Sequence, residues 1–285
     1  LFDRPTQHAK DYLNRKFGKK EAILNANIKA LADGFNYGHN THATATTYRI
    51  EGRKQTPGVY MDISGNKATA YGLVAAAEHA NLNLFLGSYP ITPATDILHE
   101  LAKLKSLGVK TFQAEDEIAG ICTAIGASFA GDLAVTTTSG PGLALKSEAL
   151  GLTVMAELPL VLVDVQRGGP STGLPTKSEQ TDLLQALFGR NGESPIPVIA
   201  ATTPSDCFDS AFWACKIALE HMTPVILLTD AFIANGSSAW RIPDPQSYPD
   251  IRPPYVDQYK GEAKWRHYFR NEETHVRYWA IPGQE

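Results

Sequence analysis

The chain has 285 residues, of which 43% are hydrophobic and 20% are charged. A chain of this size and composition can bury one sizeable core and a smaller appendage, so we expect a soluble globular protein. Its formal net charge of -4, with no basic run, argues against nucleic acid or an anionic membrane surface as a partner. No apolar stretch reaches the roughly 20 residues that a membrane-spanning helix needs.

Cysteine and histidine usage indicates neither a disulfide framework nor a metal site. Cys122, Cys207 and Cys215 are too few and too scattered for disulfides, a CxxC pair or an iron–sulfur ligand set. All three lie in apolar, helix-like contexts, so we expect buried, inert thiols and a reducing cytoplasm. The eight histidines lack ligand spacing, so we expect no metal on this chain.

Residues 1–60 are mostly polar. The apolar stripe Ile23, Leu24, Ile28, Leu31 and Phe35 predicts a helix over residues 20–35, and a weakly patterned stretch follows it. We interpret residues 1–60 as the tail of a preceding domain and a linker. Since the first residue is leucine, we expect a piece of a longer chain.

Residues 61–240 alternate short apolar runs with amphipathic segments. Continuous apolar strands separated by helices indicate βαβ crossovers, which place helices on both faces of the sheet. We therefore predict one doubly wound α/β domain with a mostly parallel sheet. The expected strands cover residues 83–90, 109–114, 133–140, 159–166, 196–201 and 224–232, and the expected helices cover residues 94–108, 115–131, 142–158, 177–189 and 204–222.

Residues 241–285 begin with a segment that is rich in proline. "IPDPQSYPDIRPPY" carries five prolines and cannot form a regular helix. We interpret this end of the chain as a linker or the start of a following domain.

Ligands of doubly wound sheets bind beyond the carboxyl ends of the strands, and "SYPITP" follows the first expected strand. Pro90 and Pro93 fix their own backbone and restrict the residues before them, so Thr92 is held in a stiff loop. The ordinary alternative is a strand-to-helix turn in which Thr92 or Thr95 caps the next helix.

"QAEDEIAG" places Glu115, Asp116 and Glu117 where the next strand becomes a helix. The helix dipole favours acidic residues there, which accounts for Glu115 and Asp116. Glu117 begins a face of small and apolar residues, so we expect it to point inward at the edge of the sheet. An inward carboxyl at such a junction is a catalytic candidate.

"TTTSGPGLALK" follows the third expected strand. Free backbone N–H groups at the start of the next helix could hold an anion, although the pattern matches neither a P-loop nor GxGxxG. A tight turn is the more ordinary interpretation of the two glycines.

"VQRGGPSTGLPTKSEQ" places Arg167 directly after a buried strand. An arginine there is costly unless it meets an anion, because the guanidinium stays charged and its planar fork suits carboxylate or phosphate. The structural alternative is a salt bridge to Glu115 or Asp116.

Several common catalytic motifs are missing from the sequence. There is no GxSxG elbow, no Walker motif and no glycine fingerprint for a dinucleotide. Hydrolase, nucleotide kinase, zinc enzyme and nucleotide-binding dehydrogenase are therefore disfavoured.

Taken in this order, "LGSYPITP", "AEDEIAGICTAIGASFAGD", "TTTSGPG" and "QRGGPSTGLPTKSEQTDLLQALFG" closely resemble the α subunit of 2-oxoacid:ferredoxin oxidoreductases, above all the 2-oxoglutarate type. The resemblance covers about residues 65–235. It implies a thiamine diphosphate-binding fold whose domain grips the aminopyrimidine of the cofactor. It also implies that a β subunit supplies Mg²⁺ for the diphosphate and a [4Fe-4S] cluster.

The resemblance assigns the cofactor contacts residue by residue. Glu117 matches the glutamate that hydrogen-bonds the pyrimidine N1′, with Glu115 as the fallback. The shared proton promotes the imino tautomer, whose exocyclic nitrogen removes the thiazolium C2 proton. Tyr89, Pro90 and Ile91 of the proline loop are the other expected cofactor contacts.

For the substrate, the resemblance assigns Arg167 to the carboxylate of a 2-oxoacid and Thr92 to its orientation. A cation and a hydroxyl suit an anionic substrate that forms a tetrahedral adduct and then loses CO₂.

The implied reaction is the oxidative decarboxylation of a 2-oxoacid, with 2-oxoglutarate favoured, to its acyl-CoA. Coenzyme A, ferredoxin and the β subunit are then the expected partners, in a homo- or hetero-oligomer. Residues 1–60 resemble the end of a γ-type domain, and residues 241–285 the linker to the next domain. Two alternatives stay open: a member that takes pyruvate, a branched-chain or an aryl oxoacid, and a non-catalytic scaffold of the same fold.

Overall fold

The computed structural model describes residues 2, 4–42, 44, 46–52, 54–255 and 266–283. The chain forms two compact units, Leu1–Pro57 and Gly58–Glu285. The first unit is a pair of helices in mutual contact, α1 (Gln7–Phe17) and α2 (Glu21–Asn40). The helix predicted over residues 20–35 is therefore confirmed and continues to Asn40, while α1 was not predicted. Neither helix buries a residue fully: Leu24, Ile28 and Leu31 of the α2 stripe are half-buried, whereas Ile23 and Phe35 are exposed.

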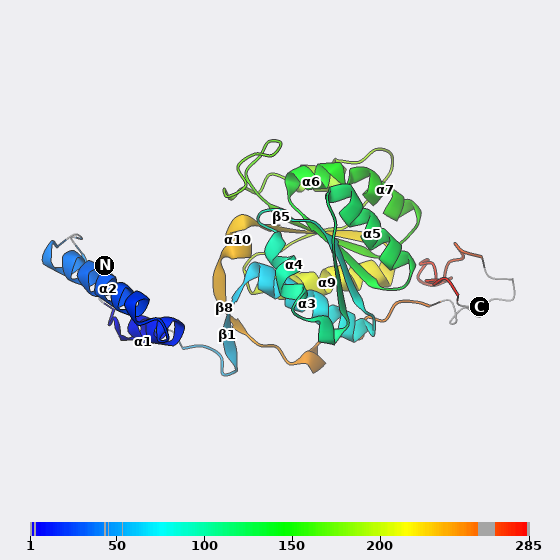
Figure 1. The fold of residues 1–285 in the computed structure, drawn as a ribbon. Coiled ribbons are helices and arrows are strands. Elements are labelled where there is room, and N and C mark those ends of the chain that lie inside the picture. The colour runs from blue at the N-terminus through cyan, green and yellow to red at the C-terminus, as the bar shows by residue number, and fades with distance from the viewer. Residues whose placement is uncertain are drawn as a thin grey trace. The chain divides into compact units, whose positions relative to one another are not determined.

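The second unit is built on a parallel sheet of six strands, in the order β3-β2-β4-β5-β7-β6 (Figure 1). The strands are β2 (Leu84–Ser88), β3 (Val109–Gln113), β4 (Leu133–Thr138), β5 (Leu160–Gln166), β6 (Val198–Ala200) and β7 (Pro224–Asp230). Every residue of β4, β5 and β7 is buried, which is why these strands are continuous apolar runs.

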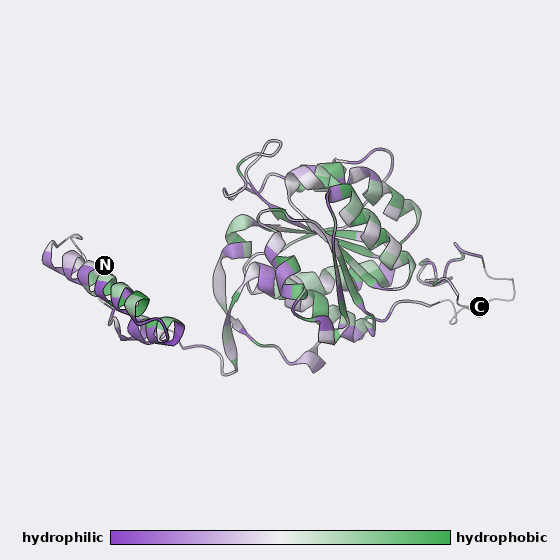
Figure 2. Ribbon diagram, in the orientation of Figure 1, coloured by the Kyte–Doolittle hydropathy of each residue, from purple (hydrophilic) through white to green (hydrophobic). Residues whose placement is uncertain are grey.

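Helices cover both faces of this sheet, which confirms the doubly wound α/β prediction. One apolar cluster joins the sheet to α3 (Gly65–Ala80), α4 (Thr95–Leu101) and α9 (Asp206–His221). A second cluster joins the opposite face to α5 (Glu117–Phe129), α6 (Gly140–Leu145), α7 (Ser147–Met155) and α8 (Leu183–Phe188). The hydropathy colouring of Figure 2 shows the apolar residues concentrated in the sheet and the helices that cover it.

The strand order reverses beside β2. The chain passes from β2 outward to β3 and then returns to the other side of β2 as β4. Ladder pairing between β2 and β4 ends at Leu86 and Val135, whereas β2 stays paired with β3 as far as Ser88 and Gln113. The carboxyl ends of β2 and β4 therefore separate, and a crevice at such a reversal is the usual ligand site of a doubly wound sheet.

Two predicted helices differ from the structure. The helix expected over residues 177–189 exists only as α8, because the residues before Leu183 form a loop whose side chains bind Gly169, after β5, and Asp230, at the end of β7. The helix expected over residues 142–158 is divided into α6 and α7 at Lys146. In both places tertiary contacts override an amphipathic pattern.

The sequence reasoning also missed elements at the edges of the domain. The helix α3 and a second, two-stranded antiparallel sheet were not predicted. That sheet pairs β1 (Tyr60–Ser64) with β8 (Ser237–Arg241), and the short helix α10 (Ala231–Asn235) lies between β7 and β8.

The cysteine prediction is partly wrong. Cys207 and Cys215 are buried free thiols on α9, as expected, and burial raises the pKa of both thiols. Cys122 is exposed, because it lies on the outer face of α5. That face carries apolar residues such as Ile118 and Phe129 without covering them, so apolar context alone misplaced this cysteine.

The described part of residues 241–283 packs onto the α/β unit. The 3₁₀ helix η2 (Pro245–Ser247) is the only helical turn in this part. Arg277 and Trp279 are fully buried, and the Arg277 Nε donates to the Glu157 carbonyl, 3.0 Å away. No helix among the described residues is both long and apolar enough to cross a membrane.

Close packing of α3 against α9 generates a test of this architecture. A Cβ on Gly72 would lie 2.2 Å from the Phe208 carbonyl oxygen, so Gly72→Ala must push the two helices apart. We expect a loss of about 1–3 kcal/mol in the free energy of unfolding, measured by urea denaturation. The control is Gly151→Ala in α7, where the new methyl meets no atom within 4 Å. It should gain about 0.5–1 kcal/mol. Wild-type stability in Gly72→Ala would contradict the packing.

Candidate active site

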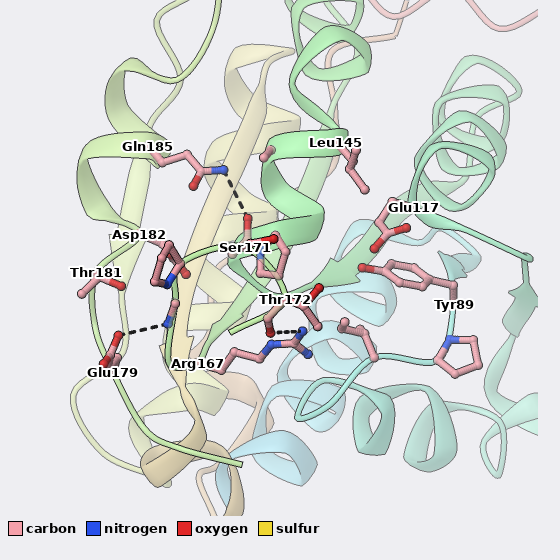
Figure 3. Close-up of a pocket in the computed structure, with 17 residues that line it drawn as sticks. Tyr89, Glu117, Leu145, Arg167, Ser171, Thr172, Glu179, Thr181, Asp182 and Gln185 are labelled. Carbon is pink, nitrogen blue, oxygen red and sulfur yellow. Dashed lines mark hydrogen bonds between the residues drawn. The ribbon is translucent and has the colours of Figure 1, made fainter. Parts of the chain in front are cut away.

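A pocket of about 1040 Å³ opens at the carboxyl ends of β2, β4 and β5 (Figure 3). Its walls come from the loops after these strands, from the start of α5 and from α6 and α8. The lining residues are Tyr89, Pro90, Ile91, Glu117, Gly140, Pro141, Ala144, Leu145, Arg167, Gly169, Pro170, Ser171, Thr172, Glu179, Thr181, Asp182 and Gln185. All four motifs that the sequence placed at strand ends therefore contribute to one cavity.

Two hydroxyl pairs join β2 and β4 where their ladder has ended. Ser88 Oγ lies 2.5 Å from Thr137 Oγ1, and Tyr89 Oη lies 2.9 Å from Thr138 Oγ1. All four residues are buried. Side-chain hydrogen bonds thus replace backbone pairing at the crevice and place the Tyr89 ring in the pocket wall.

The proline loop after β2 is held from two sides. Asn66 Nδ2 of α3 donates to the Pro93 carbonyl at 2.9 Å. Thr95 Oγ1 accepts from the Ile91 N–H at 2.8 Å and donates to the Ile91 carbonyl at 2.9 Å. Thr95 therefore braces the loop, and the prediction that it caps the helix is wrong, because α4 begins after Ala94 without a side-chain cap. The loop is stiff for reasons beyond its two prolines.

Thr92 does not line the pocket, unlike Tyr89, Pro90 and Ile91. It is exposed, and its described contact with the site is made by its backbone: the Thr92 carbonyl accepts a hydrogen bond from Arg167 Nη1 at 2.6 Å. The structure brings Thr92 and Arg167 together, but through the peptide rather than the hydroxyl.

The three acidic residues before α5 have different places. Asp116 is the N-cap, and its Oδ1 accepts from the Ala119 N–H at 2.8 Å. Glu115 is exposed and does not line the pocket. Glu117 is the first helical residue and lines the pocket, with its carboxylate directed toward Tyr89 in Figure 3. Of the two candidate glutamates, only Glu117 reaches the cavity.

Glu117 and Tyr89 are electrostatically linked. Burial, followed by the neighbouring Glu117 carboxylate, raises the pKa of the Tyr89 phenol above its ordinary value. The phenol is therefore a hydrogen-bond donor throughout the physiological range. Gly142 lets Tyr89 and Glu117 lie close to the backbone of α6. A Cβ there would lie 2.0 Å from Thr138 Oγ1, 2.3 Å from Tyr89 Oη and 3.0 Å from Glu117 Cγ.

Arg167 is 6% exposed and is held by carbonyls. Nη1 donates to Thr92, and Nη2 donates to the Thr172 carbonyl at 2.9 Å, while Nε is buried without a partner. Within the described residues Arg167 has no carboxylate partner, so the salt bridge to Glu115 or Asp116 is not formed. A buried cation that is fixed by neutral groups at the wall of a pocket is suited to an incoming anion.

The loop between Arg167 and α8 closes on itself. The Gly168 N–H donates to the Lys177 carbonyl at 2.8 Å, and the Gly169 N–H donates to Glu179 Oε2 at 3.1 Å. Gln185 Nε2 of α8 donates to the Gly140 carbonyl at 3.2 Å, which connects this wall to α6. Sequence reasoning missed Glu179 and Gln185 because nothing in a presumed surface helix marked them as pocket residues.

Two further charged residues near the pocket were also missed. Lys146 is completely buried at the junction of α6 and α7. Asp164 is completely buried on β5, next to the pocket residue Asp182. The signal that could have found them is a charged residue inside an otherwise apolar segment, "GLALKSEALGL" for Lys146 and "PLVLVDVQ" for Asp164.

Asp164 and Asp182 form a carboxyl pair. Both Asp164 oxygens and Asp182 Oδ2 are buried without another partner. Burial raises the pKa of both groups, and the charge of Asp182 raises that of Asp164 further. Burial and the neighbouring carboxyl therefore favour the protonated form of Asp164. The Asp182 N–H also donates to Gln166 Oε1 at 3.0 Å, which fixes the end of the loop against β5.

The walls around Glu117 suit one face and edge of a heteroaromatic ring. A carboxylate and a phenol offer polar contacts at the ring edge, while Ile91, Pro141 and Leu145 provide apolar surface for its face. Within the described residues, no group of three or more His, Cys, Asp or Glu side chains is arranged to hold a metal ion.

The carboxyl pair predicts a pH dependence of stability. Folding raises the pKa of Asp164, so between the unfolded and the folded pKa the folded state retains a proton that the unfolded chain releases. The free energy of unfolding therefore falls as pH rises through this interval. Asp164→Asn removes this titration and keeps a donor for Asp182. The free energy of unfolding, measured by urea denaturation from about pH 4 to pH 8, should fall less with pH than in wild type. The exposed control Asp96→Asn should keep the wild-type slope. An unchanged slope in Asp164→Asn would contradict a raised pKa of Asp164.

Comparison with known proteins identifies a family. The family model "Pyruvate flavodoxin/ferredoxin oxidoreductase, thiamine diP-binding" matches residues 75–280. In Mycobacterium tuberculosis, the 2-oxoglutarate oxidoreductase subunit KorA is 56% identical over 99% of this chain and 43% of its own length. In Archaeoglobus fulgidus, the 2-oxoglutarate synthase subunit KorA is 42% identical over 64% of this chain and 51% of its own length.

A solved structure extends the likeness to the whole chain. The 2-oxoglutarate:ferredoxin oxidoreductase from Magnetococcus marinus, with 2-oxoglutarate, coenzyme A and succinyl-CoA bound, aligns with a TM-score of 0.82 and 37% identity. The alignment covers 99% of this chain and 48% of that chain. The chain thus spans about half the length of these relatives. It belongs to the thiamine diphosphate-binding family of pyruvate flavodoxin/ferredoxin oxidoreductases.

Proposed function

We propose that this chain supplies the aminopyrimidine-binding half of a thiamine diphosphate site in a 2-oxoacid:ferredoxin oxidoreductase. The reaction is the oxidative decarboxylation of a 2-oxoacid to its acyl-CoA, with electrons passed to ferredoxin. The observation that carries the proposal is the Glu117 carboxylate beside the buried Tyr89 phenol, at the point where the strand order reverses. The relatives named for 2-oxoglutarate favour that substrate.

Glu117 is the catalytic carboxyl in this proposal. Its place at the start of α5 lets it accept a hydrogen bond from a ring nitrogen at the pocket wall, while Tyr89, Pro90 and Ile91 contact the ring. When bound, thiamine diphosphate supplies the carbanion chemistry that decarboxylation needs. The contribution of this chain is a carboxylate that holds and returns one proton at N1′. Glu115 stays the fallback, although it lies outside the pocket.

Arg167 and Thr92 serve the 2-oxoacid. The Arg167 guanidinium is buried, oriented by two carbonyls and free of a described carboxylate partner, so it can bind the acid group of the substrate with little reorganisation. The Thr92 carbonyl accepts a hydrogen bond from Arg167 and orients its guanidinium. Thr92 thereby helps to orient the substrate through Arg167.

The remaining parts of the site belong to a partner. We assign Mg²⁺, the diphosphate contacts and a [4Fe-4S] cluster to a β subunit, in a homo- or hetero-oligomer that binds coenzyme A and ferredoxin. The free thiols support a reducing, cytoplasmic location. We keep residues 1–60 as the tail of a γ-type domain with a linker, residues 61–240 as the pyrimidine-binding domain, and residues 241–285 as a linker or the start of a following domain.

Two alternatives make different predictions. A member that takes pyruvate, a branched-chain or an aryl oxoacid would differ in the residues that meet the substrate side chain, some of them on the β subunit, so a substrate panel separates it. A non-catalytic scaffold would have no reason to keep Glu117, Tyr89 and Arg167 around one cavity, and this arrangement favours an enzyme.

The decisive variant is Glu117→Gln in the complete complex. A glutamine keeps the shape of the side chain but cannot exchange a proton with N1′, so the rate of 2-oxoacid-dependent ferredoxin reduction should fall by at least about 100-fold. The assay is run on a panel of 2-oxoacids with coenzyme A, and we expect 2-oxoglutarate to be turned over fastest.

The matched control is Glu115→Gln, which should keep the wild-type rate. Thermal unfolding of both variants separates a catalytic defect from a folding defect. Loss of activity in Glu115→Gln with retained activity in Glu117→Gln would transfer the role to Glu115. Wild-type turnover in both variants would remove the carboxylate from the mechanism.

A further inference from the structure

Lys146 is a buried cation directly behind the pocket wall. It is completely buried, and its Nζ donates to the Glu117 carbonyl at 2.8 Å and to Thr136 Oγ1 at 3.0 Å. The same nitrogen lies 5.2 Å from the centroid of the Tyr89 ring. Lys146 thus contacts the start of α5, strand β4 and the proline loop, which are three of the elements that form the pocket.

The three N–H groups of this ammonium have three partners. One carbonyl, one hydroxyl and one ring face satisfy them, and no ion pair is formed with a described carboxylate. Burial lowers the pKa of Lys146 to about 8, and the charges of Glu117, Asp116 and Cys122 act in the opposite direction. Tyr89, on the remaining side, is a neutral phenol. An apolar side chain of equal length would fill this space without the desolvation cost, so packing alone does not account for a lysine.

The contacts of Lys146 include Glu117, the acidic residue of α5 that lines the pocket. The Glu117 carbonyl is bound by Nζ, and the preceding residue, Asp116, caps the same helical turn. Gly120, one turn later, lies against the same ammonium, since a Cβ there would be 3.5 Å from Nζ, an ordinary contact distance. The first turn of α5 is therefore held at its N-cap and at the peptide of Glu117. These two contacts fix the position of the Glu117 backbone, from which its side chain extends.

We propose that Lys146 is a positioning residue for Glu117: its buried ammonium holds the first peptide of α5 and places a positive charge behind the Glu117 carboxylate, so that the carboxylate meets the ring nitrogen of the cofactor. This inference rests on the proposed function. It adds a second charged group to the pyrimidine site, one that never touches the cofactor.

The unfolding temperature of a variant distinguishes this positioning role from a purely structural role of Lys146. Lys146→Met keeps the length and the apolar stem of the side chain and removes a desolvated charge, so the variant should unfold at the wild-type temperature or above it. A structural lysine would instead lower the unfolding temperature and the function together. The matched control is Lys105→Met, the same change at an exposed lysine.

The test is calorimetric titration of thiamine diphosphate, with Mg²⁺, into the complex of the full-length protein with its β subunit. At pH 7 we expect Lys146→Met to bind about tenfold more weakly than wild type, and Lys105→Met to bind like wild type. Between about pH 7 and pH 9, wild type should lose affinity as Lys146 releases its proton. Lys146→Met should show a smaller change over that range.

Three results would overturn the inference. Equal affinity of wild type and Lys146→Met removes the role of Lys146 and leaves the proposed function in place. Weaker binding that accompanies an equal loss of thermal stability assigns Lys146 to folding alone. Failure of the wild-type complex to bind thiamine diphosphate overturns the proposed function and this inference together.

Discussion

The separation of β2 and β4 beyond Leu86 and Val135 is the constraint on which the rest of the site depends. Parallel strands that stay paired would bury their ends, whereas these two diverge and leave backbone groups and side chains facing a crevice. Two hydroxyl pairs, Ser88 with Thr137 and Tyr89 with Thr138, keep the gap at a defined width. Most segments that line the pocket follow β2 and β4, which flank this gap, or the adjacent strand β5.

The walls are ordered before any ligand arrives. Asn66 and Thr95 fix the proline loop, the Thr172 carbonyl and Thr92 orient the guanidinium of Arg167, and the Asp164 and Asp182 pair ends the loop that follows. These contacts use buried hydrogen bonds, which are strong in a medium of low dielectric and costly to leave unmade. Ligand binding therefore requires little ordering of this half of the site.

Much of the fold and some of the site were predictable from the sequence. Continuous apolar runs between amphipathic segments identified all six parallel strands, because strands covered on both faces cannot alternate in polarity. Pro90, Glu117 and Arg167 were found because strand ends are where a doubly wound sheet binds ligands. Family resemblance then gave these residues roles that their chemistry alone left open.

The errors have physical causes. The division of a helix at Lys146 and the shortening of α8 depend on contacts with residues distant in sequence, which a local pattern does not contain. Cys122 was misplaced because the outer face of α5 is apolar yet exposed. The places of Thr92 and Thr95 depend on loop geometry, where a hydroxyl can brace a backbone as well as cap a helix.

The most direct test is the structure of the complete complex with thiamine diphosphate bound. We expect a carboxylate oxygen of Glu117 within hydrogen-bond distance of the pyrimidine N1′, roughly 2.7–3.0 Å, with Tyr89 beside the ring. A ring that is held instead by Glu115, or by Glu179 and Asp182 at the opposite wall, with Glu117 turned away from it, would contradict the role of Glu117.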